Sequence, residues 1–253
     1  MTAQPQEKRI LVTGGARGVG AAIVRNLVAR GYDIDFTYRS SGDAAAMLAE
    51  TLATEHGRAV RALPLDLADK AAIEAFCATH EDTTYFGLVH NAGQPYDALT
   101  AVMMQDKAEA AMQVNFWSLT RLVKSVIRPM IRARAGRIAV IGSVTALQAN
   151  AGNAAYAASK GALLSYLRTL AVESAKRGVT ANYIAPGFID TDMMTPYVAY
   201  RATMEKQIPA GRFAAPEEIA SLVAFLMSEP AAYITGAVIP IDGGLTAQLG
   251  VHR

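Results

Sequence analysis

Cysteine is almost absent from this chain of 253 residues, which contains only Cys77. A single cysteine cannot form an intrachain disulfide, and this is typical of proteins from a reducing compartment. The four histidines, at positions 56, 80, 90 and 252, lack the spacing of metal ligands, and no Cys/His cluster is present. The sequence therefore predicts no metal site.

Long apolar runs and a strong charge of one sign are also missing. No apolar stretch reaches a bilayer-spanning length, and the polar residues Met1 to Arg9 lack the apolar centre of a secretion signal. The formal net charge is only +2, and no segment concentrates the basic residues. We expect a soluble cytoplasmic protein without a membrane or nucleic-acid partner, in which residues 1–8 form a flexible tail.

Short apolar runs alternate with helical patterns along the whole chain. Seven segments have the composition of strands: 9–13, 32–38, 59–65, 85–90, 137–141, 179–185 and 237–241. No composition break, repeat or low-complexity segment marks a second domain. The pattern predicts one α/β domain over residues 1–253, with a doubly wound, Rossmann-type sheet of about seven parallel strands and helices on both faces.

A glycine-rich turn joins the first predicted strand to the first predicted helix. Glycines allow the backbone to approach a pyrophosphate, and a helix N-terminus offers free N–H groups and a partial positive charge. Such a turn can also be purely structural, but the regular strand and helix around it favour a dinucleotide site. The candidate residues are Gly14, Ala16, Arg17, Gly18, Val19 and Gly20.

The end of the second strand indicates which dinucleotide is bound. A NAD site places an acid there to hold the ribose 2′-hydroxyl. Here the nearest acid, Asp35, falls within the strand, and Arg39 stands at its end. Arg39, or Arg17 in the glycine loop, would meet a 2′-phosphate, although both could equally be solvated loop arginines. We therefore expect NADPH/NADP+.

Two further strands end in candidate cofactor contacts. Asp66, followed by Leu67, could accept a hydrogen bond from the adenine amino group or cap the next helix, for which Asp69 competes. The segment Asn91-Ala92-Gly93 is small enough to allow close approach of a ligand or of a neighbouring element.

A hydroxyl, a phenol and an amine lie within one short stretch. Tyr156 and Lys160 are four residues apart, so they share one face of a helix. An ammonium there should lower the pKa of the phenol from about 10. Ser143 follows a predicted strand, where parallel sheets place their chemistry. In isolation the Tyr-x-x-x-Lys pattern also fits an ordinary surface pair.

The long helical stretch 107–134 carries Asn115 among apolar neighbours. A buried amide needs hydrogen-bond partners, so Asn115 is either structural or binds a water in a proton path. Pro129 is predicted to kink or divide this stretch. Residues 192–212 have the weakest pattern of the chain, and we interpret them as a mobile substrate lid, with an ordinary loop of short helices as the alternative.

Taken together, these motifs resemble the short-chain dehydrogenase/reductase family from Lys8 to about Leu245. The residues that carry the resemblance are Thr13-Gly14-x-x-x-Gly18-x-Gly20, Asn91-Ala92-Gly93, the set Asn115, Ser143, Tyr156 and Lys160, and Pro186-Gly187. The resemblance implies an NADPH-dependent oxidoreductase whose cofactor contacts include Asn91, Ala92, Gly93, Tyr156, Lys160, Pro186, Gly187, Ile189 and Thr191.

Within this family the chain is most similar to 3-oxoacyl-(acyl-carrier-protein) reductases. The similar stretches are Tyr183 to Met193, Ile208 to Phe213 and Tyr233 to Gly236. Two departures concern the site: His90 replaces the more usual Asn before the Asn-Ala-Gly motif, and residues 94–96 are unlike the commoner sequence.

That similarity implies hydride transfer to a β-keto thioester. Tyr156 would protonate the forming alkoxide, Ser143 would hydrogen-bond the carbonyl, and Lys160 would hold the nicotinamide ribose. Asn115 would bind a water that links Lys160 to solvent.

Family members usually form tetramers, so a homotetramer is expected. An acidic acyl carrier protein would meet basic residues, for which Arg128 and Arg177 are the candidates. The competing functions are reduction of a sugar, steroid or small ketone by the same fold, and a non-catalytic cofactor-binding scaffold.

Overall fold

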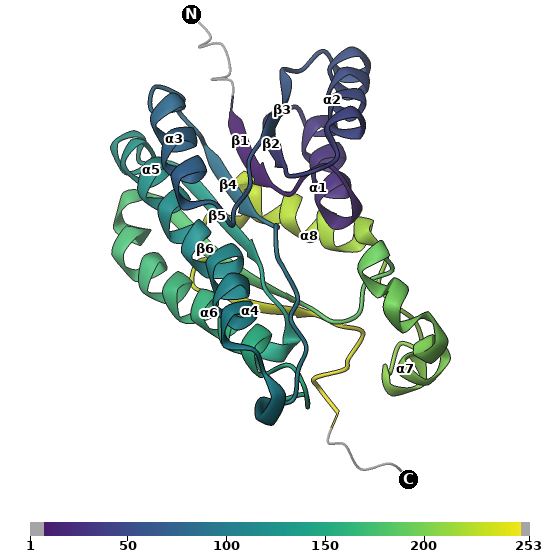
Figure 1. Ribbon diagram of the computed structural model, residues 1–253. Coiled ribbons are helices and arrows are strands. Elements are labelled where there is room, and N and C mark those ends of the chain that lie inside the picture. Colours follow the sequence, from purple (N-terminus) through teal and green to yellow (C-terminus); the bar gives the residue numbers. More distant parts are fainter. Residues whose placement is uncertain (1–7, 249–253) are drawn as a thin grey trace, which may run out of the picture.

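Seven parallel strands form a single sheet in the computed structural model, which describes residues 8–248. The strands are β1 (Arg9–Thr13), β2 (Asp33–Tyr38), β3 (Val60–Pro64), β4 (Gly87–His90), β5 (Gly136–Ile141), β6 (Val179–Pro186) and β7 (Val238–Ile241). Their order is β3-β2-β1-β4-β5-β6-β7, and every neighbouring pair is parallel. The order reverses between β1 and β4, where open sheets of this kind bind their ligands (Figure 1).

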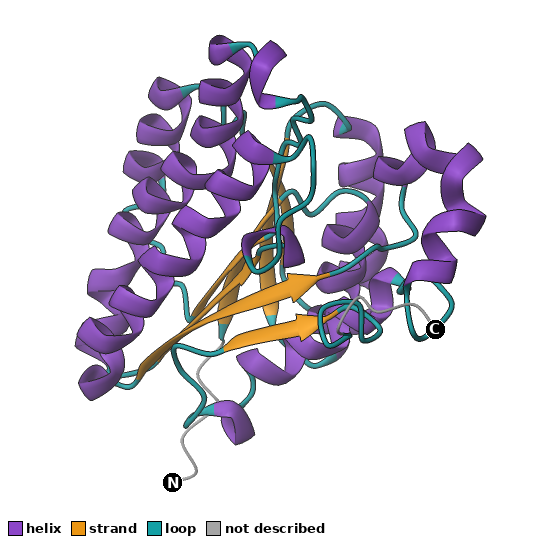
Figure 2. Ribbon diagram, turned by 90° about the horizontal axis from the view of Figure 1, so that it is seen from below, coloured by secondary structure: helices purple, strands orange, loops and turns teal. Residues whose placement is uncertain are grey.

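Helices cover both faces of the sheet, as predicted from the sequence. One face carries α1 (Gly18–Ala29), α2 (Gly42–His56) and α8 (Pro216–Met227), and the other carries α3 (Lys70–Thr79), α5 (Ser118–Ala133) and α6 (Ala154–Ser174). Figure 2 shows the sheet edge-on between these two layers. The remaining helices are α4 (Gln105–Met112), which precedes α5, and α7 (Arg201–Gln207), which lies between β6 and α8.

Each layer of helices packs on its own apolar core. Successive strand residues point to opposite faces, so β1 places Ile10 and Val12 in the core under α1 and α8, and Leu11 in the core under α3 and α5. All three side chains are buried. Burial on both faces is the reason that β1, β4 and β5 contain unbroken apolar runs, such as Ile10 to Val12 and Ile138 to Ile141.

The long helical stretch 107–134 is interrupted at a different place from the one predicted. Helix α5 runs through Pro129 to Ala133, whereas residues Gln113–Trp117 form a π-helix. Pro129 lies close to the C-terminal end of α5, where Val126 and Met130 are buried in the core on either side of it. The loss of one backbone hydrogen bond does not divide a helix held in this way. Of the two predicted effects of Pro129, a kink or a division, the division was therefore wrong, and the kink stays a prediction.

Candidate active site

The glycine loop between β1 and α1 is tied to the segment that follows β4. The Asn91 side-chain nitrogen donates to the carbonyl oxygens of Gly14 (3.0 Å) and Thr13 (3.2 Å). Gly14 has φ +67°, and a Cβ there would lie 3.1 Å from Ala92. A Cβ at Gly20 would overlap the Gly14 carbonyl oxygen. The backbone is therefore packed as closely as a loop that must approach a ligand requires.

The N-terminus of α1 opens from this loop without a side-chain cap from any described residue. Arg17 occupies the cap position and is exposed, Gly18 and Val19 begin the first turn, and Ala16 lies just before them, partly buried. Uncapped N–H groups together with the helix dipole make this end of α1 suited to an anion such as a pyrophosphate. That these residues bind a dinucleotide stays a prediction.

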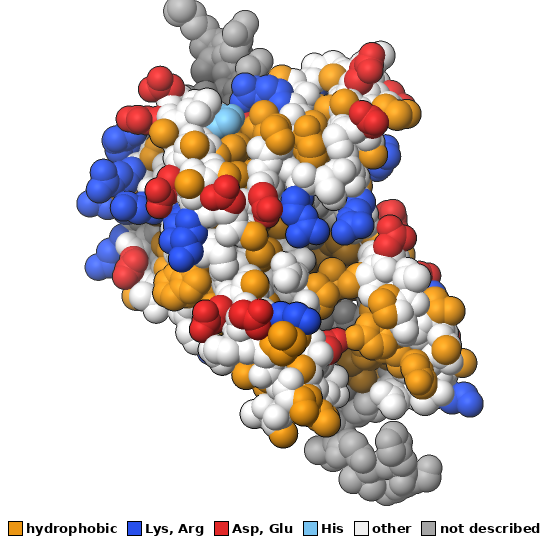
Figure 3. Space-filling view, in the orientation of Figure 1, with side chains coloured by type: hydrophobic (Ala, Val, Ile, Leu, Met, Phe, Trp, Pro, Cys, Tyr) orange, Lys and Arg blue, Asp and Glu red, His pale blue; other side chains and the backbone are white. Residues whose placement is uncertain are grey.

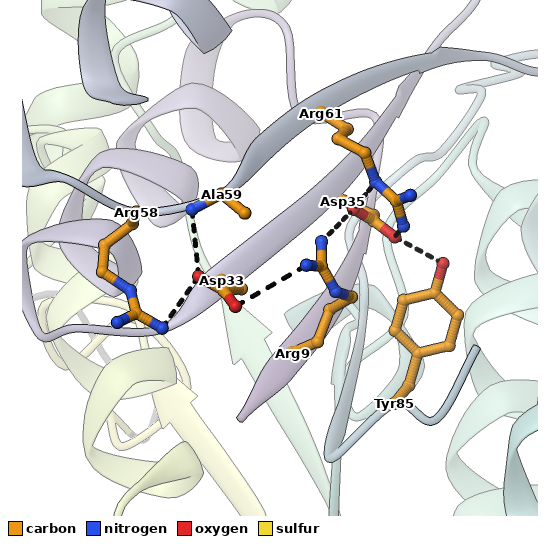
Figure 4. A network of polar contacts seen from close by, with 7 residues as sticks. All are labelled: Arg9, Asp33, Asp35, Arg58, Ala59, Arg61 and Tyr85. Carbon is orange, nitrogen blue, oxygen red and sulfur yellow. Dashed lines mark hydrogen bonds and ion pairs between the residues drawn. The ribbon is translucent and has the colours of Figure 1, made fainter. Parts of the chain in front are cut away.

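Asp35 of β2 is not available to a ribose. Its carboxylate is buried, and it accepts hydrogen bonds from Arg9 (2.8 Å), the Arg61 Nε (2.7 Å) and the Tyr85 hydroxyl (2.7 Å) (Figure 4). Burial alone would raise the pKa of Asp35, but the hydrogen bonds from Arg61 and Tyr85 hold it below its ordinary value. Asp33 joins the same network through Arg9 and Arg58.

Arg39 and Asp66 line one hollow beside α3. The hollow has a volume of about 510 Å³ and includes Leu65 and Phe76 among its walls. Both Arg39 and Asp66 are exposed. Of the two acids that compete to cap α3, the structure selects Asp69, whose carboxylate accepts from two backbone N–H groups of the first turn at 2.8 and 3.1 Å. Asp66 instead accepts from the backbone of the following loop, and Leu67 is buried beneath it.

Tyr156 and Lys160 share one face of α6, and the Lys160 Nζ lies 5.5 Å from the centre of the Tyr156 ring. The Nζ donates to the Ile141 carbonyl oxygen over 2.9 Å. Burial lowers the pKa of Lys160 to about 8. Burial, reinforced by the negative charge of Asp97, raises the pKa of Tyr156 to about 12, while an interaction with Ser143 opposes the rise.

The expectation that Lys160 lowers the pKa of the neighbouring phenol was therefore wrong for this structure. Burial is the largest cause of the raised pKa of Tyr156, and Lys160 is not among the groups that shift it. Burial also disfavours the charge of Lys160 itself.

Asn115 lies in the π-helix and is fully buried. Its side chain donates to the Ser159 hydroxyl (2.8 Å) and the Gln94 carbonyl (3.0 Å), and it accepts from the Gln94 N–H (2.7 Å). A Cβ at Gly93 would lie 3.3 Å from the Lys160 Nζ and 3.5 Å from the Asn115 Oδ1. Two of the residues predicted as catalytic, Lys160 and Asn115, thus meet at Gly93, beside a π-helix of the kind that often marks functional sites.

His90 and Thr13 form a buried hydrogen-bonded pair that was not predicted from the sequence. The Thr13 hydroxyl accepts from the N–H groups of Asn91 and Ala92, so its proton goes to the His90 Nδ1 at 3.1 Å. The His90 Nε2 must then carry a proton, which it donates to the Asn115 carbonyl over 3.1 Å. Burial lowers the pKa of His90 to about 3, in agreement with a neutral ring.

The turn after β6 carries predicted cofactor contacts, and its backbone packs closely against neighbouring segments. Pro186 ends β6, and a Cβ at Gly187 would lie 3.0 Å from Asp242 in the turn after β7. Ile189 forms a β-bridge with Ala214. The backbone of this turn is therefore held at Gly187 by close packing and at Ile189 by the β-bridge.

The segment predicted as a lid, 192–212, is a 3-10 helix (Asp192–Tyr200) followed by α7. At its start Thr191 packs against the glycine loop, 3.5 Å from the Cβ position of Gly18. Further along, the Tyr197 hydroxyl donates to the Asp97 carboxylate, which also accepts from the Asn153 side chain over 2.5 Å. Asp97 therefore joins the segment to the residue that precedes α6, and nothing in the sequence pattern pointed to it.

Two features are absent from residues 8–248. Within that range, no group of three His, Cys, Asp or Glu side chains could hold a metal ion. None of the helices in the same range is both long enough and apolar enough to span a membrane.

A doubly wound sheet, a tightly packed glycine loop at its switch point and a Ser-Tyr-Lys-Asn cluster beside that loop define a nucleotide-dependent oxidoreductase. The comparisons with known proteins narrow this class further. The family described as Enoyl-(Acyl carrier protein) reductase matches residues 14–246. The chain belongs to the short-chain dehydrogenase/reductase family.

Its relatives include the 3-oxoacyl-(acyl-carrier-protein) reductase FabG of Salmonella typhimurium, 41% identical over 243 residues, which are 94% of this chain and 97% of that protein. The enzyme of the same name from Pseudomonas aeruginosa is 42% identical over 246 residues, or 95% and 98%. A short-chain dehydrogenase/reductase from Serratia marcescens is similar in structure, with a TM-score of 0.89, 35% identity and coverage of 95% and 98%.

Proposed function

We propose that this protein reduces a 3-oxoacyl thioester carried on acyl carrier protein to the 3-hydroxyacyl product, with NADPH as the reductant. The observation that carries the proposal is the meeting of Ser143, Tyr156, Lys160 and Asn115 next to the glycine loop. The choice of substrate is supported by the names of the relatives that are 41 and 42% identical to this chain.

The residues present fit a dinucleotide. The uncapped start of α1 and the glycines around it would receive the pyrophosphate, and the Asn91-Ala92-Gly93 segment would lie against the nicotinamide half. Arg39 would pair with a 2′-phosphate. No acid competes with it at the end of β2, because Asp35 is buried and hydrogen-bonded to Arg9 and Arg61. When bound, NADPH supplies the hydride.

The side chains around the carbonyl supply the proton and stabilise the charge. With its pKa raised to about 12, Tyr156 is fully protonated at neutral pH, so it can donate its proton to the forming alkoxide. Ser143 donates a hydrogen bond to the same oxygen. Lys160 has Nζ protons beyond the one given to Ile141, and these would hold the ribose, while Asn115 would hold a water that leads to Lys160.

The surface of the segment 192–200 suits an acyl chain. It exposes Met193, Val198 and Tyr200, each by more than half of its surface. In Figure 3 hydrophobic side chains gather over the part of the molecule around α7, at the lower right. We therefore keep this segment as the substrate lid.

The test of the proposed function is NADPH oxidation with carrier-linked β-ketoacyl substrates of varied length, beside a panel of sugar, steroid and small ketones. The proposal expects the carrier-linked substrates to have the highest kcat/KM. Tyr156→Phe should lose nearly all turnover, by about 10²- to 10⁴-fold, and still bind NADPH. Higher kcat/KM for simple ketones would assign the protein to the alternative function, and substantial turnover by the variant would refute Tyr156 as the acid.

The NADPH preference has its own test. Arg39→Asp replaces the exposed cation at the end of β2 with an acid, so it should shift the ratio of kcat/KM from NADPH toward NADH. Comparing both cofactors with wild type and variant measures this shift. A wild type that already prefers NADH would contradict the proposal.

Recognition of the carrier would use exposed basic residues. Arg128 on α5 and Arg177 after α6 are both exposed, and an acidic carrier would be steered toward them. Reversing both charges should raise KM for a carrier-linked substrate and leave KM for a small soluble analogue unchanged. A homotetramer in the cytoplasm completes the proposal, and light scattering tests the assembly.

A further inference from the structure

The backbone of Ser143 is held by the phenol of Tyr183. The Ser143 N–H donates to the Tyr183 hydroxyl over 2.9 Å, and this hydroxyl donates in turn to the Ser143 carbonyl at 3.3 Å. Tyr183 lies in the middle of β6 and is only 1% exposed. A side chain at Gly142 would overlap its ring, so the glycine before Ser143 is what admits the phenol.

The hydroxyl of Ser143 is held separately by Thr145. The Thr145 N–H donates to the Ser143 Oγ over 3.1 Å, and the Thr145 hydroxyl donates to the same atom over 2.9 Å. A serine hydroxyl has two lone pairs and one proton. Both lone pairs of the Ser143 Oγ are therefore used within the short helical turn that follows β5. The Ser143 proton is not used there and can be donated elsewhere.

The side chain of Ser143 interacts with the phenol of Tyr156. The interaction with Ser143 lowers the pKa of Tyr156, which is the effect of a donor to the phenolate oxygen. In the structure it is the Thr145 hydroxyl that donates to Ser143, so the serine proton is not used in a bond to Thr145.

We propose that Thr145 and Tyr183 are positioning residues that make the Ser143 hydroxyl an obligatory donor toward the reacting carbonyl oxygen. This inference rests on the reductase function proposed above. Tyr183 fixes where the serine stands, and Thr145 fixes which way its proton points. A hydroxyl that already points at the carbonyl oxygen does not have to reorient when negative charge develops there. Its hydrogen bond therefore stabilises the oxyanion without a free-energy cost of reorganisation.

The test for Thr145 uses two matched variants. Thr145→Val keeps the shape and removes the hydroxyl, and Thr145→Ser keeps the hydroxyl. Thr145→Val should lower kcat by about three- to tenfold, the range that one hydrogen bond is worth, and leave KM for NADPH unchanged. Thr145→Ser should retain wild-type kcat. Equal kcat for Thr145→Val and wild type would overturn the assignment.

The same substitution in a Ser143→Ala background separates positioning from general structural damage. If Thr145 acts only through Ser143, Thr145→Val lowers kcat no further once the serine hydroxyl is gone. A loss of kcat equal to that in the wild-type background would show that Thr145 acts independently of Ser143 and would refute the proposal.

The role of Tyr183 has a readout that needs no substrate. Tyr183→Phe keeps the ring and removes the hydroxyl, so hydrogen–deuterium exchange should become faster in the peptide that spans residues 141–147 of the full-length protein. Tyr200→Phe, at an exposed tyrosine of the lid, is the control and should leave that peptide unchanged. Unchanged hydrogen–deuterium exchange of this peptide in Tyr183→Phe would refute the proposal that Tyr183 holds the backbone of Ser143. If no carbonyl is turned over by wild type, the proposed reductase function fails with the role toward the carbonyl, while the exchange result still decides whether Tyr183 holds Ser143.

Discussion

Replacing Lys160 with methionine should stabilise the fold while it abolishes turnover. Lys160 is 2% exposed, and burial lowers its pKa from 10.5 to about 8. One pKa unit corresponds to about 1.4 kcal/mol, so at neutral pH the buried ammonium costs the folded state at most about 3.5 kcal/mol. Methionine fills a similar volume without that charge.

The gain is smaller than this limit because Lys160 also donates to the Ile141 carbonyl oxygen. Leaving that buried acceptor unpaired costs about 1–3 kcal/mol. The net stabilisation is then about 0.5–2.5 kcal/mol. For a chain of this size it should raise the thermal midpoint by about 1–10 °C at pH 7.

The pH dependence identifies the cause of the stabilisation. Below about pH 8 the lysine is charged in both the folded and the unfolded state, and the folded state bears the full cost of burial. Between about pH 8 and 10.5 the folded protein releases this proton while the unfolded chain keeps it. The free energy of unfolding of wild type therefore rises with pH in this window, and its difference from Lys160→Met shrinks.

Thermal unfolding of wild type, Lys160→Met and a control, Lys124→Met at an exposed lysine of α5, at pH 7 and pH 10 measures both effects. The control should unfold like wild type at both pH values. A Lys160→Met variant that is less stable than wild type at pH 7, or a difference that does not change between the two pH values, would refute the reasoning. Higher stability with lost turnover is the trade-off expected of a functional group that is costly to bury.

Two further predictions concern packing and the lid. Gly142→Ala should lower the thermal midpoint and kcat together, because its Cβ would overlap the ring of Tyr183. The drop in midpoint caused by Gly142→Ala should be smaller in a Tyr183→Ala background, where that ring is absent. Tyr197→Phe removes the hydrogen bond to Asp97, so peptides of residues 192–207 should exchange hydrogen faster and KM for the substrate should change by about two- to tenfold. Tyr200→Phe in the same segment is the control, and equal exchange in both variants would show that the bond to Asp97 does not hold the lid.

Much of the fold could be predicted from the sequence because its signals are local. Apolar runs bounded by glycine and proline located the seven strands, although half of the strand ends differ by one or two residues, as for the segment 85–90, of which only Gly87–His90 is β4. The spacing of Tyr156 and Lys160 placed both on one face of α6, since a helix repeats every 3.6 residues. The glycine loop, too, is contiguous in the chain and therefore readable.

Predictions from the sequence were wrong where the outcome depends on how the surrounding core packs and how much water it excludes. Pro129 has the same chemistry in any helix, but only the core around Val126 and Met130 decides that α5 continues through it. The pKa of Tyr156 depends on how much water is excluded, and this outweighed the lysine that the sequence places nearby.

The sequence by itself determined the class of protein, because strand–helix alternation, the glycine loop and the spacing of the catalytic residues are properties of short stretches. Only the tertiary structure decided how the donors and acceptors are paired. His90 meets the Asn115 carbonyl across 25 positions of sequence, and Tyr183 meets Ser143 across 40. Such contacts leave no periodic trace, because they depend on which strands become neighbours and which side chains the shared core excludes from water.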